Sequence, residues 1–253
     1  MLLALVRAAL GTGFTFLMTA LGAASVFFFA HEPKPQAQNG LLGFAAGVMT
    51  AASVWSLLLP AIDQARQLNT LPAWLPAAAG LLVGAVFLAL LDAALPRLRR
   101  VLLPEGQRQN ALLMTAITLH NIPEGMAVGL AFALSTQLES SLAAASALAL
   151  GIGIQNFPEG AAVALPLRRE GRSRWAAFVG GMLSGAVEPI FGVAVVLAAS
   201  GVSAMMPWLL SFAAGAMLYV VVEELVPQAR SRAGTTGFVL GFLIMMILDV
   251  ALG

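Results

Sequence analysis

Long apolar stretches dominate this chain of 253 residues and leave it few ways to fold. A membrane-spanning helix needs about twenty apolar residues to cross a hydrocarbon layer about 30 Å thick. Eight stretches meet that length, at approximately residues 5–30, 40–66, 73–96, 109–135, 141–166, 175–199, 204–228 and 235–252. Backbone N–H and C=O groups in lipid must be satisfied within the protein, which favours helices. We therefore expect an all-α integral membrane protein with eight transmembrane helices in a single transmembrane domain over residues 1–253.

The composition excludes several other classes of protein. Charged residues make up 10% of the chain, whereas soluble domains carry roughly 25%. The net charge of +1 comes without a basic stripe interleaved with aromatic residues, so no nucleic-acid partner is expected. The chain has no cysteine, which excludes disulfides, thiolate metal sites and cysteine nucleophiles.

Basic residues predict the orientation of the chain, because short cytoplasmic loops carry an excess of Lys and Arg. The loops after the first, third, fifth and seventh stretches hold Lys34, Arg97, Arg99, Arg100, Arg108, Arg168, Arg169, Arg172, Arg174, Arg230 and Arg232. Only Arg7 and Arg66 lie on the opposite side. Both termini are therefore predicted to lie outside the cytoplasm.

The sequence also repeats itself. Phe44-Ala45-Ala46-Gly47-Val48-Met49 matches Phe212-Ala213-Ala214-Gly215-Ala216-Met217, and Gly80, Gly84 and Asp92 match Gly237, Gly241 and Asp249 in spacing. The second and third stretches thus correspond to the seventh and eighth. A shift of five stretches reverses the direction across the membrane, which predicts an inverted repeat of the kind found in transporters. The arrangement is three plus two plus three: helices over 5–96, a central pair over 109–166, and helices over 175–252.

Two polar motifs interrupt the apolar pattern of the central pair. His120-Asn121-Ile122-Pro123-Glu124-Gly125 returns thirty-five residues later as Gln155-Asn156-Phe157-Pro158-Glu159-Gly160. Polar and ionisable residues inside a membrane are costly and usually functional. Pro123 and Pro158 each remove a helical hydrogen bond, so we expect kinks at both motifs. The alternative is a purely structural role, in which each motif is a proline kink with a hydrogen-bonded Asn–Glu pair.

Helical spacing predicts a metal site from these motifs. Residues four and three apart share a face of a helix, so Glu124 can act with His120 or with Asn121, and the second motif repeats the geometry. We expect two adjacent divalent ions bridged by Glu124 and Glu159. One ion would bind His120 and Gln155, and the other Asn121 and Asn156.

Charge balance strengthens the metal hypothesis. Glu124, Glu159 and Glu188 lie near the middles of stretches that contain no Lys or Arg. Unpaired carboxylates at that depth are expected to bind cations or protons. Imidazole, amide and carboxylate ligands without thiolate suit Zn²⁺, Fe²⁺, Mn²⁺ and related ions.

Other residues keep two interpretations. Met49 could be a thioether ligand, although a methionine at helical spacing more often fills core. Ser56 lies on the same helix face as Met49 and could likewise be either a ligand or a core residue. Asp63, Glu223 and Glu224 lie toward helix ends, where they could line a pathway or only extend to water.

At these residues the sequence resembles the ZIP family (Zrt- and Irt-like proteins) of divalent metal transporters, especially its short bacterial members. The resemblance rests on both motifs, on Glu188 and on the stretch Phe44–Met49. It implies a multi-pass protein of the bacterial inner membrane that moves zinc, or cadmium, iron or manganese, into the cytoplasm. The metal is then substrate, with two ions per site, and no enzymatic activity or catalytic cofactor is implied.

The resemblance also assigns residues. One metal position would use Met49, His120, Glu124, Gln155 and Glu159, and the other Asn121, Glu124, Asn156, Glu159 and Glu188. Many members have a histidine where this chain has Gln155, and some have an aspartate where it has Asn156. The family has been described as moving the central helices and their neighbours against the rest.

Two other functions stay open at this point. An intramembrane metal-dependent hydrolase would need a metal with an open position for water, but no His-Glu-x-x-His segment is present. A passive metal channel would use the same ligands without a conformational cycle. The expected partners are metal ions and the lipid bilayer, and a homodimer stays open.

Overall fold

The computed structural model describes residues 1–28, 35–102, 108–136, 141–169, 171–199 and 203–252. Lys34 and the side chains of Arg97, Arg99, Arg100, Arg108 and Arg169 lie outside this description. Every regular element within the described ranges is helical. The α-helices are α1 (Leu2–Ala23), α2 (Pro35–Ala52), α3 (Leu59–Leu68), α4 (Trp74–Leu102), α5 (Arg108–Leu134), α6 (Ser141–Arg169), α7 (Arg174–Gly185), α8 (Val187–Ala199), α9 (Met206–Val220), α10 (Val226–Gln228) and α11 (Arg232–Leu252).

Within the described residues, six helical segments are long and apolar enough to cross a membrane, judged by length and composition. They are Leu2–Phe27, Pro35–Leu68, Trp74–Ala94, Arg174–Ala198, Met206–Gln228 and Arg232–Ala251. Each coincides with a predicted stretch. The predicted central pair corresponds to α5 and α6, of 27 and 29 residues, which carry the polar motifs. The all-α, multi-pass prediction is confirmed.

Three of the segments are irregular in ways that the sequence pattern did not predict. A π-helical turn over Ser53–Leu58 joins α2 to α3, and another over Val221–Leu225 joins α9 to α10. Such turns are frequent at functional sites. The chain also breaks at Ala186 between α7 and α8, where Pro189 cannot donate a hydrogen bond to the carbonyl of Gly185.

Pro123 and Pro158 behave differently from Pro189. Both lie inside α5 and α6, which continue through them. The missing N–H groups therefore do not end either helix. The predicted kinks do not take the form of a break in the helices.

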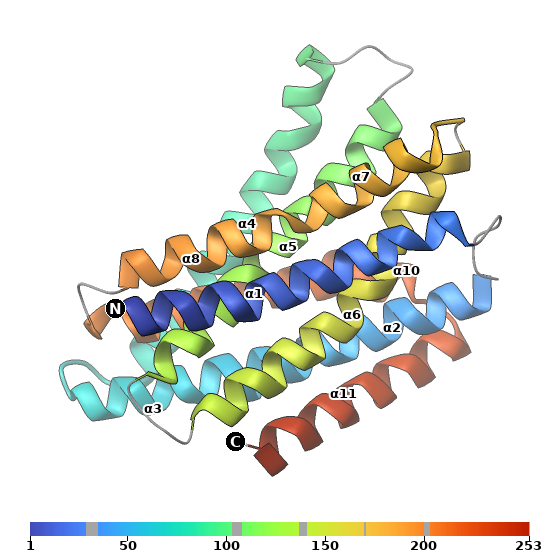
Figure 1. Ribbon diagram of the computed structural model, residues 1–253. Helices are drawn as coiled ribbons and strands as arrows, with labels where there is room; N and C mark the ends of the chain where they lie inside the picture. The colour runs from blue at the N-terminus through green and yellow to red at the C-terminus, as the bar shows by residue number, and fades with distance from the viewer. Residues whose placement is uncertain (29–34, 103–107, 137–140, 170, 200–202, 253) are drawn as a thin grey trace.

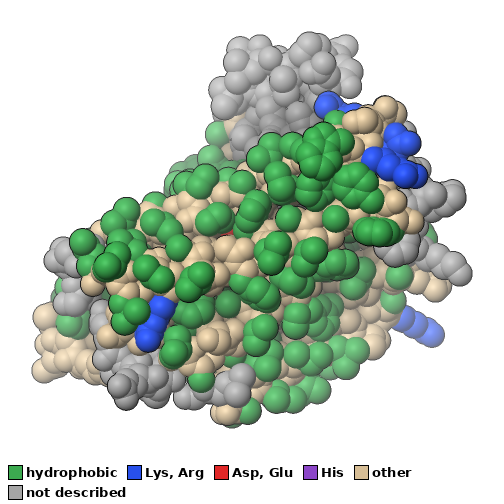
Figure 2. Space-filling view, viewed as in Figure 1, with side chains coloured by type: hydrophobic (Ala, Val, Ile, Leu, Met, Phe, Trp, Pro, Cys, Tyr) green, Lys and Arg blue, Asp and Glu red, His purple; other side chains and the backbone are tan. Residues whose placement is uncertain are grey.

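The helices pack in two groups. One group contains α1, α5, α6, α7 and α8, and the other contains α2, α3, α4, α9 and α11. Figure 1 shows α1 running alongside α6 and α8, and α2 alongside α11. Packing of α5 on α9, and of α6 on α2 and α11, joins the groups. Hydrophobic side chains cover the visible face in Figure 2, and its Lys and Arg side chains lie toward the ends, as expected for a protein in lipid.

Glycines bring the helices of the second group together. A Cβ at Gly47 of α2 would strike the carbonyl oxygen of Phe238 in α11, and a Cβ at Gly215 of α9 would strike that of Leu81 in α4. Gly241 and Gly84 make the reciprocal contacts, with the carbonyls of Phe44 and Phe212. Small residues permit this close approach of backbones in membrane proteins. The α2–α11 and α4–α9 pairs therefore use the same contacts at matching positions of the two sequence repeats.

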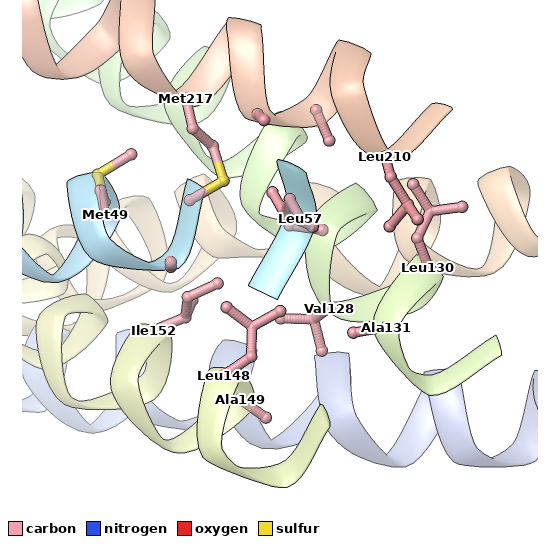
Figure 3. Close-up of a cluster of buried hydrophobic side chains, with 14 of the residues drawn as sticks. Met49, Leu57, Val128, Leu130, Ala131, Leu148, Ala149, Ile152, Leu210 and Met217 are labelled. Atoms are coloured by element: carbon pink, nitrogen blue, oxygen red, sulfur yellow. The ribbon is translucent and has the colours of Figure 1, made fainter. Parts of the chain in front are cut away.

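A hydrophobic core fills the space where the two groups meet. Leu57 of the first π-helical turn, Leu130 of α5, Leu148 of α6 and Leu210 of α9 are all fully buried and belong to one cluster. Figure 3 shows these side chains together. This core joins the central helices to the helices of the second group.

The glycine contacts lead to a prediction about stability. Gly47→Ala should lower the melting temperature of the purified protein in detergent, because the new methyl group meets backbone that cannot rotate away. Overpacking of this kind costs about 1–3 kcal/mol. Gly13→Ala is the matched control, since no heavy atom lies within 4 Å of its added Cβ. If both variants melt at or above the wild-type temperature, Gly47 is not a packing contact.

Candidate metal centre

The two motifs lie in buried parts of α5 and α6, as predicted. His120 is 7% exposed, and the side chains that are fully buried are Asn121, Glu124, Gln155, Asn156 and Glu188. Glu159 is partly exposed, but its Oε2 atom is buried. The structure thus holds seven of the eight predicted ligands in or beside the central pair of helices and α8.

The motif glycines bring the neighbouring helices close at this level. A Cβ at Gly125 would meet the backbone of Glu188 in α8, its nearest atom being the carbonyl oxygen. A Cβ at Gly160 would meet the carbonyl of Thr19 in α1. Glycine is therefore required at both positions for α8 and α1 to lie against the motifs.

The first side-chain pair joins the two motifs directly. Gln155 donates from Nε2 to Glu124 Oε1 over 2.6 Å. This bond uses the donor end of the amide. It leaves Gln155 Oε1 and Glu124 Oε2 buried without a hydrogen-bond partner among the described residues.

The second pair joins α6 to α8. Asn156 donates from Nδ2 to both carboxylate oxygens of Glu188, over 2.9 and 3.0 Å. Asn121 donates from Nδ2 to the carbonyl oxygen of Ser184 over 2.9 Å. In both amides the nitrogen is used and the oxygen, Oδ1, has no partner in the described part of the chain.

Five buried oxygens of the two motifs thus have no hydrogen-bond partner among the described residues. Eight buried side-chain polar atoms lack a partner among the described residues, and five of them belong to the motifs: Asn121 Oδ1, Glu124 Oε2, Gln155 Oε1, Asn156 Oδ1 and Glu159 Oε2. An unsatisfied buried polar atom costs about 1–3 kcal/mol. Amide and carboxylate oxygens of this kind are ligands for hard or borderline divalent cations.

Electrostatics favours a cation at the same place. Glu124 lies near enough to Glu159 and Glu188 for their charges to repel one another. Yet no group of three or more His, Asp or Glu side chains is arranged to hold a metal within the described residues. Two of the predicted ligand positions in the second motif hold the amides Gln155 and Asn156. Any metal bound here would therefore depend on amide oxygens.

His120 has a partner that the sequence did not predict. Its Nε2 lies 2.7 Å from Oε1 of Glu224, which is in the π-helical turn after α9. The contact crosses from the first group of helices to the second. In this structure the imidazole therefore contacts the π-helical turn after α9, and none of the described hydrogen bonds joins it to Gln155.

Comparison with known proteins decides the family. Residues 103–249 match the family model described as ZIP Zinc transporter. Zinc transporter ZIP11 of Homo sapiens is 36% identical, with 98% of this chain and 97% of that protein aligned. Zinc transporter GufA of Myxococcus xanthus is 40% identical, with 93% of this chain and 94% of that protein aligned. Zinc transporter ZIPB of Bordetella bronchiseptica is 38% identical, with 97% of this chain and 81% of that protein aligned.

The chain belongs to the ZIP family of zinc transporters. It is thus a membrane transporter and not an enzyme, as the resemblance implied. The resemblance read from the two motifs, Glu188 and Phe44–Met49 is confirmed at the level of the family.

Met49 and Ser56 are two further candidate residues of this ZIP protein. The thioether of Met49 is fully buried, and Figure 3 shows it among hydrophobic side chains that include Ile152 and Met217. Ser56 donates to Asp249 Oδ1 over 2.6 Å, and both residues are buried. None of the described hydrogen bonds joins Met49 or Ser56 to the motif side chains.

Two acidic residues weighed as pathway residues differ in their surroundings. Asp63 pairs with Arg66 over 3.0 Å at an exposed part of α3. Glu224 is half-buried against His120. The sequence signal for such a contact is the pair Glu223 and Glu224 in an apolar stretch, which does not indicate the partner. Of Asp63 and Glu224, only Glu224 contacts the motifs.

The Asn156–Glu188 pair leads to a second prediction. Asn156→Asp replaces a donor to both carboxylate oxygens with a second carboxylate, so the metal-free protein should melt several degrees below wild type. Cadmium or zinc should raise the melting temperature of this variant more than that of wild type, because the cation offsets the repulsion. Asn69→Asp, at an exposed left-handed turn, carries the same charge change and should behave like wild type. An unchanged metal-free melting temperature for Asn156→Asp would contradict the described pairing.

Proposed function

We propose that this protein carries divalent metal ions, zinc foremost, across the membrane into the cytoplasm through a midplane site between α5 and α6. The observation that carries the proposal is the set of five buried motif oxygens without a partner in the described chain. The human, Myxococcus and Bordetella relatives are all zinc transporters, which supports zinc as the substrate.

The site is proposed to be binuclear. Glu124 and Glu159 would bridge two ions. Met49, His120 and Gln155 would complete one position, and Asn121, Asn156 and Glu188 the other. The observed pairing supports this division, because Gln155 bonds Glu124 while Asn156 bonds Glu188. The same ligand types would also accept Cd²⁺, Fe²⁺ or Mn²⁺.

Metal binding would require the amides to reorient. Gln155 now presents N–H groups to Glu124, and a metal bound there would take the place of that donor. Rotation of the amide about its last torsion exchanges nitrogen and oxygen, and so turns a donor into a ligand. Asn156 can make the same exchange at Glu188. The amides thus satisfy the carboxylates without metal and ligate with it.

His120 would connect the site to the cytoplasm. Its partner Glu224 lies in the part of the chain that leads to Arg230 and Arg232, which the distribution of basic residues places on the cytoplasmic side. An ion leaving the motifs would meet this carboxylate next. Release toward the cytoplasm is therefore part of the proposal.

The proposed architecture has eight spans in a three-plus-two-plus-three inverted repeat with both termini outside the cytoplasm. The matched glycine contacts of α2–α11 and α4–α9 support the repeat. The π-helical turns support the repeat as well. They begin at Ser53 and Val221, each six residues after the corresponding glycine, Gly47 or Gly215. Two bacterial relatives support a bacterial inner membrane as the location.

Zinc uptake into proteoliposomes tests the proposal. The double variant Glu124→Ala, Glu159→Ala should lose saturable uptake of radiolabelled zinc, because both bridging carboxylates are gone. The matched control is Ser25→Ala, Ser211→Ala, which also removes two buried oxygens without described partners, but outside the motifs. Equal uptake by wild type and the glutamate variant would contradict the proposed site.

The same assay separates a carrier from a channel. A carrier with a binding site at the motifs gives uptake that saturates with zinc concentration, whereas a passive channel gives a flux that rises in proportion over the same range. The hydrolase alternative loses its support with the family assignment.

A further inference from the structure

A row of buried threonines lines one face of α1. Thr12, Thr15 and Thr19 are each fully buried in this mostly apolar helix. Thr12 donates to the carbonyl of Ala8 over 2.7 Å, and Thr15 donates to that of Thr12 over 3.0 Å. Such bonds to the preceding turn are the usual way for a hydroxyl to be satisfied inside a helix.

Thr19 has an additional acceptor on another helix. Its Oγ1 lies 3.3 Å from the carbonyl of Thr15 and 3.3 Å from Oε1 of Glu188. The hydroxyl has one proton, so it can leave the carbonyl of its own helix and donate to the carboxylate. Thr15 also lies near Glu188, while its own hydroxyl donates to the carbonyl of Thr12.

Backbone contacts fix Thr19 in this position. Its carbonyl oxygen lies against Gly160 of α6, at the end of the second motif. One turn farther along α1, Gly22 lies against the carbonyl of Phe157. A Cβ added at Gly185 of α7 would lie 2.8–2.9 Å from three side-chain atoms of Thr19. These contacts hold the backbone and the Cβ of Thr19 in place beside Glu188.

The hydrogen bonds distinguish the two oxygens of Glu188. Oε1 accepts from Thr19 and from Asn156 Nδ2, which lies 2.9 Å away. Among the described residues, Oε2 accepts only from Asn156, over 3.0 Å. Since a carboxylate oxygen has about two acceptor sites, Oε1 is fully used and Oε2 keeps one free.

We propose that Thr19, backed by Thr15, is a positioning residue of the metal site, which anchors Oε1 of Glu188 so that Oε2 faces the ion. This inference rests on the proposed function, because it assumes that Glu188 is a metal ligand. It adds α1, which lies outside the residues matched by the family model, to the elements that build the site. Partners that orient a metal ligand typically change metal affinity by about 10–100-fold when they are removed.

Equilibrium binding of ⁶⁵Zn²⁺ to the purified full-length protein tests the inference. Glu188→Gln first identifies the binding step to which this carboxylate contributes. Thr19→Val keeps the shape of the side chain and removes the hydroxyl, so it should weaken the same step by about 10-fold or more. Thr15→Val, Thr19→Val should weaken it further, and Thr19→Ser should restore it.

Thr12→Val is the matched control, since it removes a buried hydroxyl of the same row that bonds only the preceding turn. It should bind zinc like wild type. Melting temperatures of the metal-free proteins show whether Thr19→Val acts through folding, and the expected result is a weaker affinity with a melting temperature equal to that of Thr12→Val.

The results separate this inference from the proposed function. If Glu188→Gln weakens zinc binding but Thr19→Val and the double threonine variant do not, Thr19 has no positioning role and the metal site stands. The inference is also overturned if Thr12→Val weakens binding as much as Thr19→Val, or if Thr19→Ser fails to restore it. If the wild-type protein binds no zinc, or if Glu188→Gln has no effect, then Glu188 is not a ligand and the premise itself fails.

Discussion

Three carboxylates inside apolar helices are the constraint on which the rest of the structure depends. Glu124 and Glu188 are fully buried, Glu159 has a buried oxygen, and the surrounding stretches contain no Lys or Arg. Burying unpaired charge is very costly, so the protein must supply donors or bind a cation. It supplies amide donors from Gln155 and Asn156, and these leave their own oxygens unsatisfied. The buried oxygens that keep no partner among the described residues are the atoms that the proposed cation would bind.

The glycines make this arrangement possible. Gly125 and Gly160 let α8 and α1 lie directly against the two motifs, so that Glu188 and Thr19 reach the same place. A separate set of glycines joins α2 to α11 and α4 to α9, which builds the second group of helices around matching contacts. Between the groups lie a hydrophobic core and the His120–Glu224 contact. Motion of one group against the other would therefore change the surroundings of His120 first.

Much of this could be predicted from the sequence, because the signals are local. The apolar stretches predicted the helices, and the paired motifs with Glu188 predicted the side chains that lie together. The break at Ala186, the two π-helical turns, the Glu224 partner of His120 and the Thr19–Glu188 contact were not predicted. The break follows from Pro189, a local signal that hydropathy alone does not use. The last two contacts join helices far apart in the chain, which hydropathy and spacing do not encode.

The position of metal in the molecule is the most direct test of the central claim. Crystals soaked in zinc or cadmium, with anomalous scattering recorded at the metal edge, would locate bound ions without any assumption about ligands. We expect two peaks between α5 and α6, beside Glu124 and Glu159, with the second peak next to Glu188. Bound metal found only elsewhere, with no peak between these helices, would contradict the account.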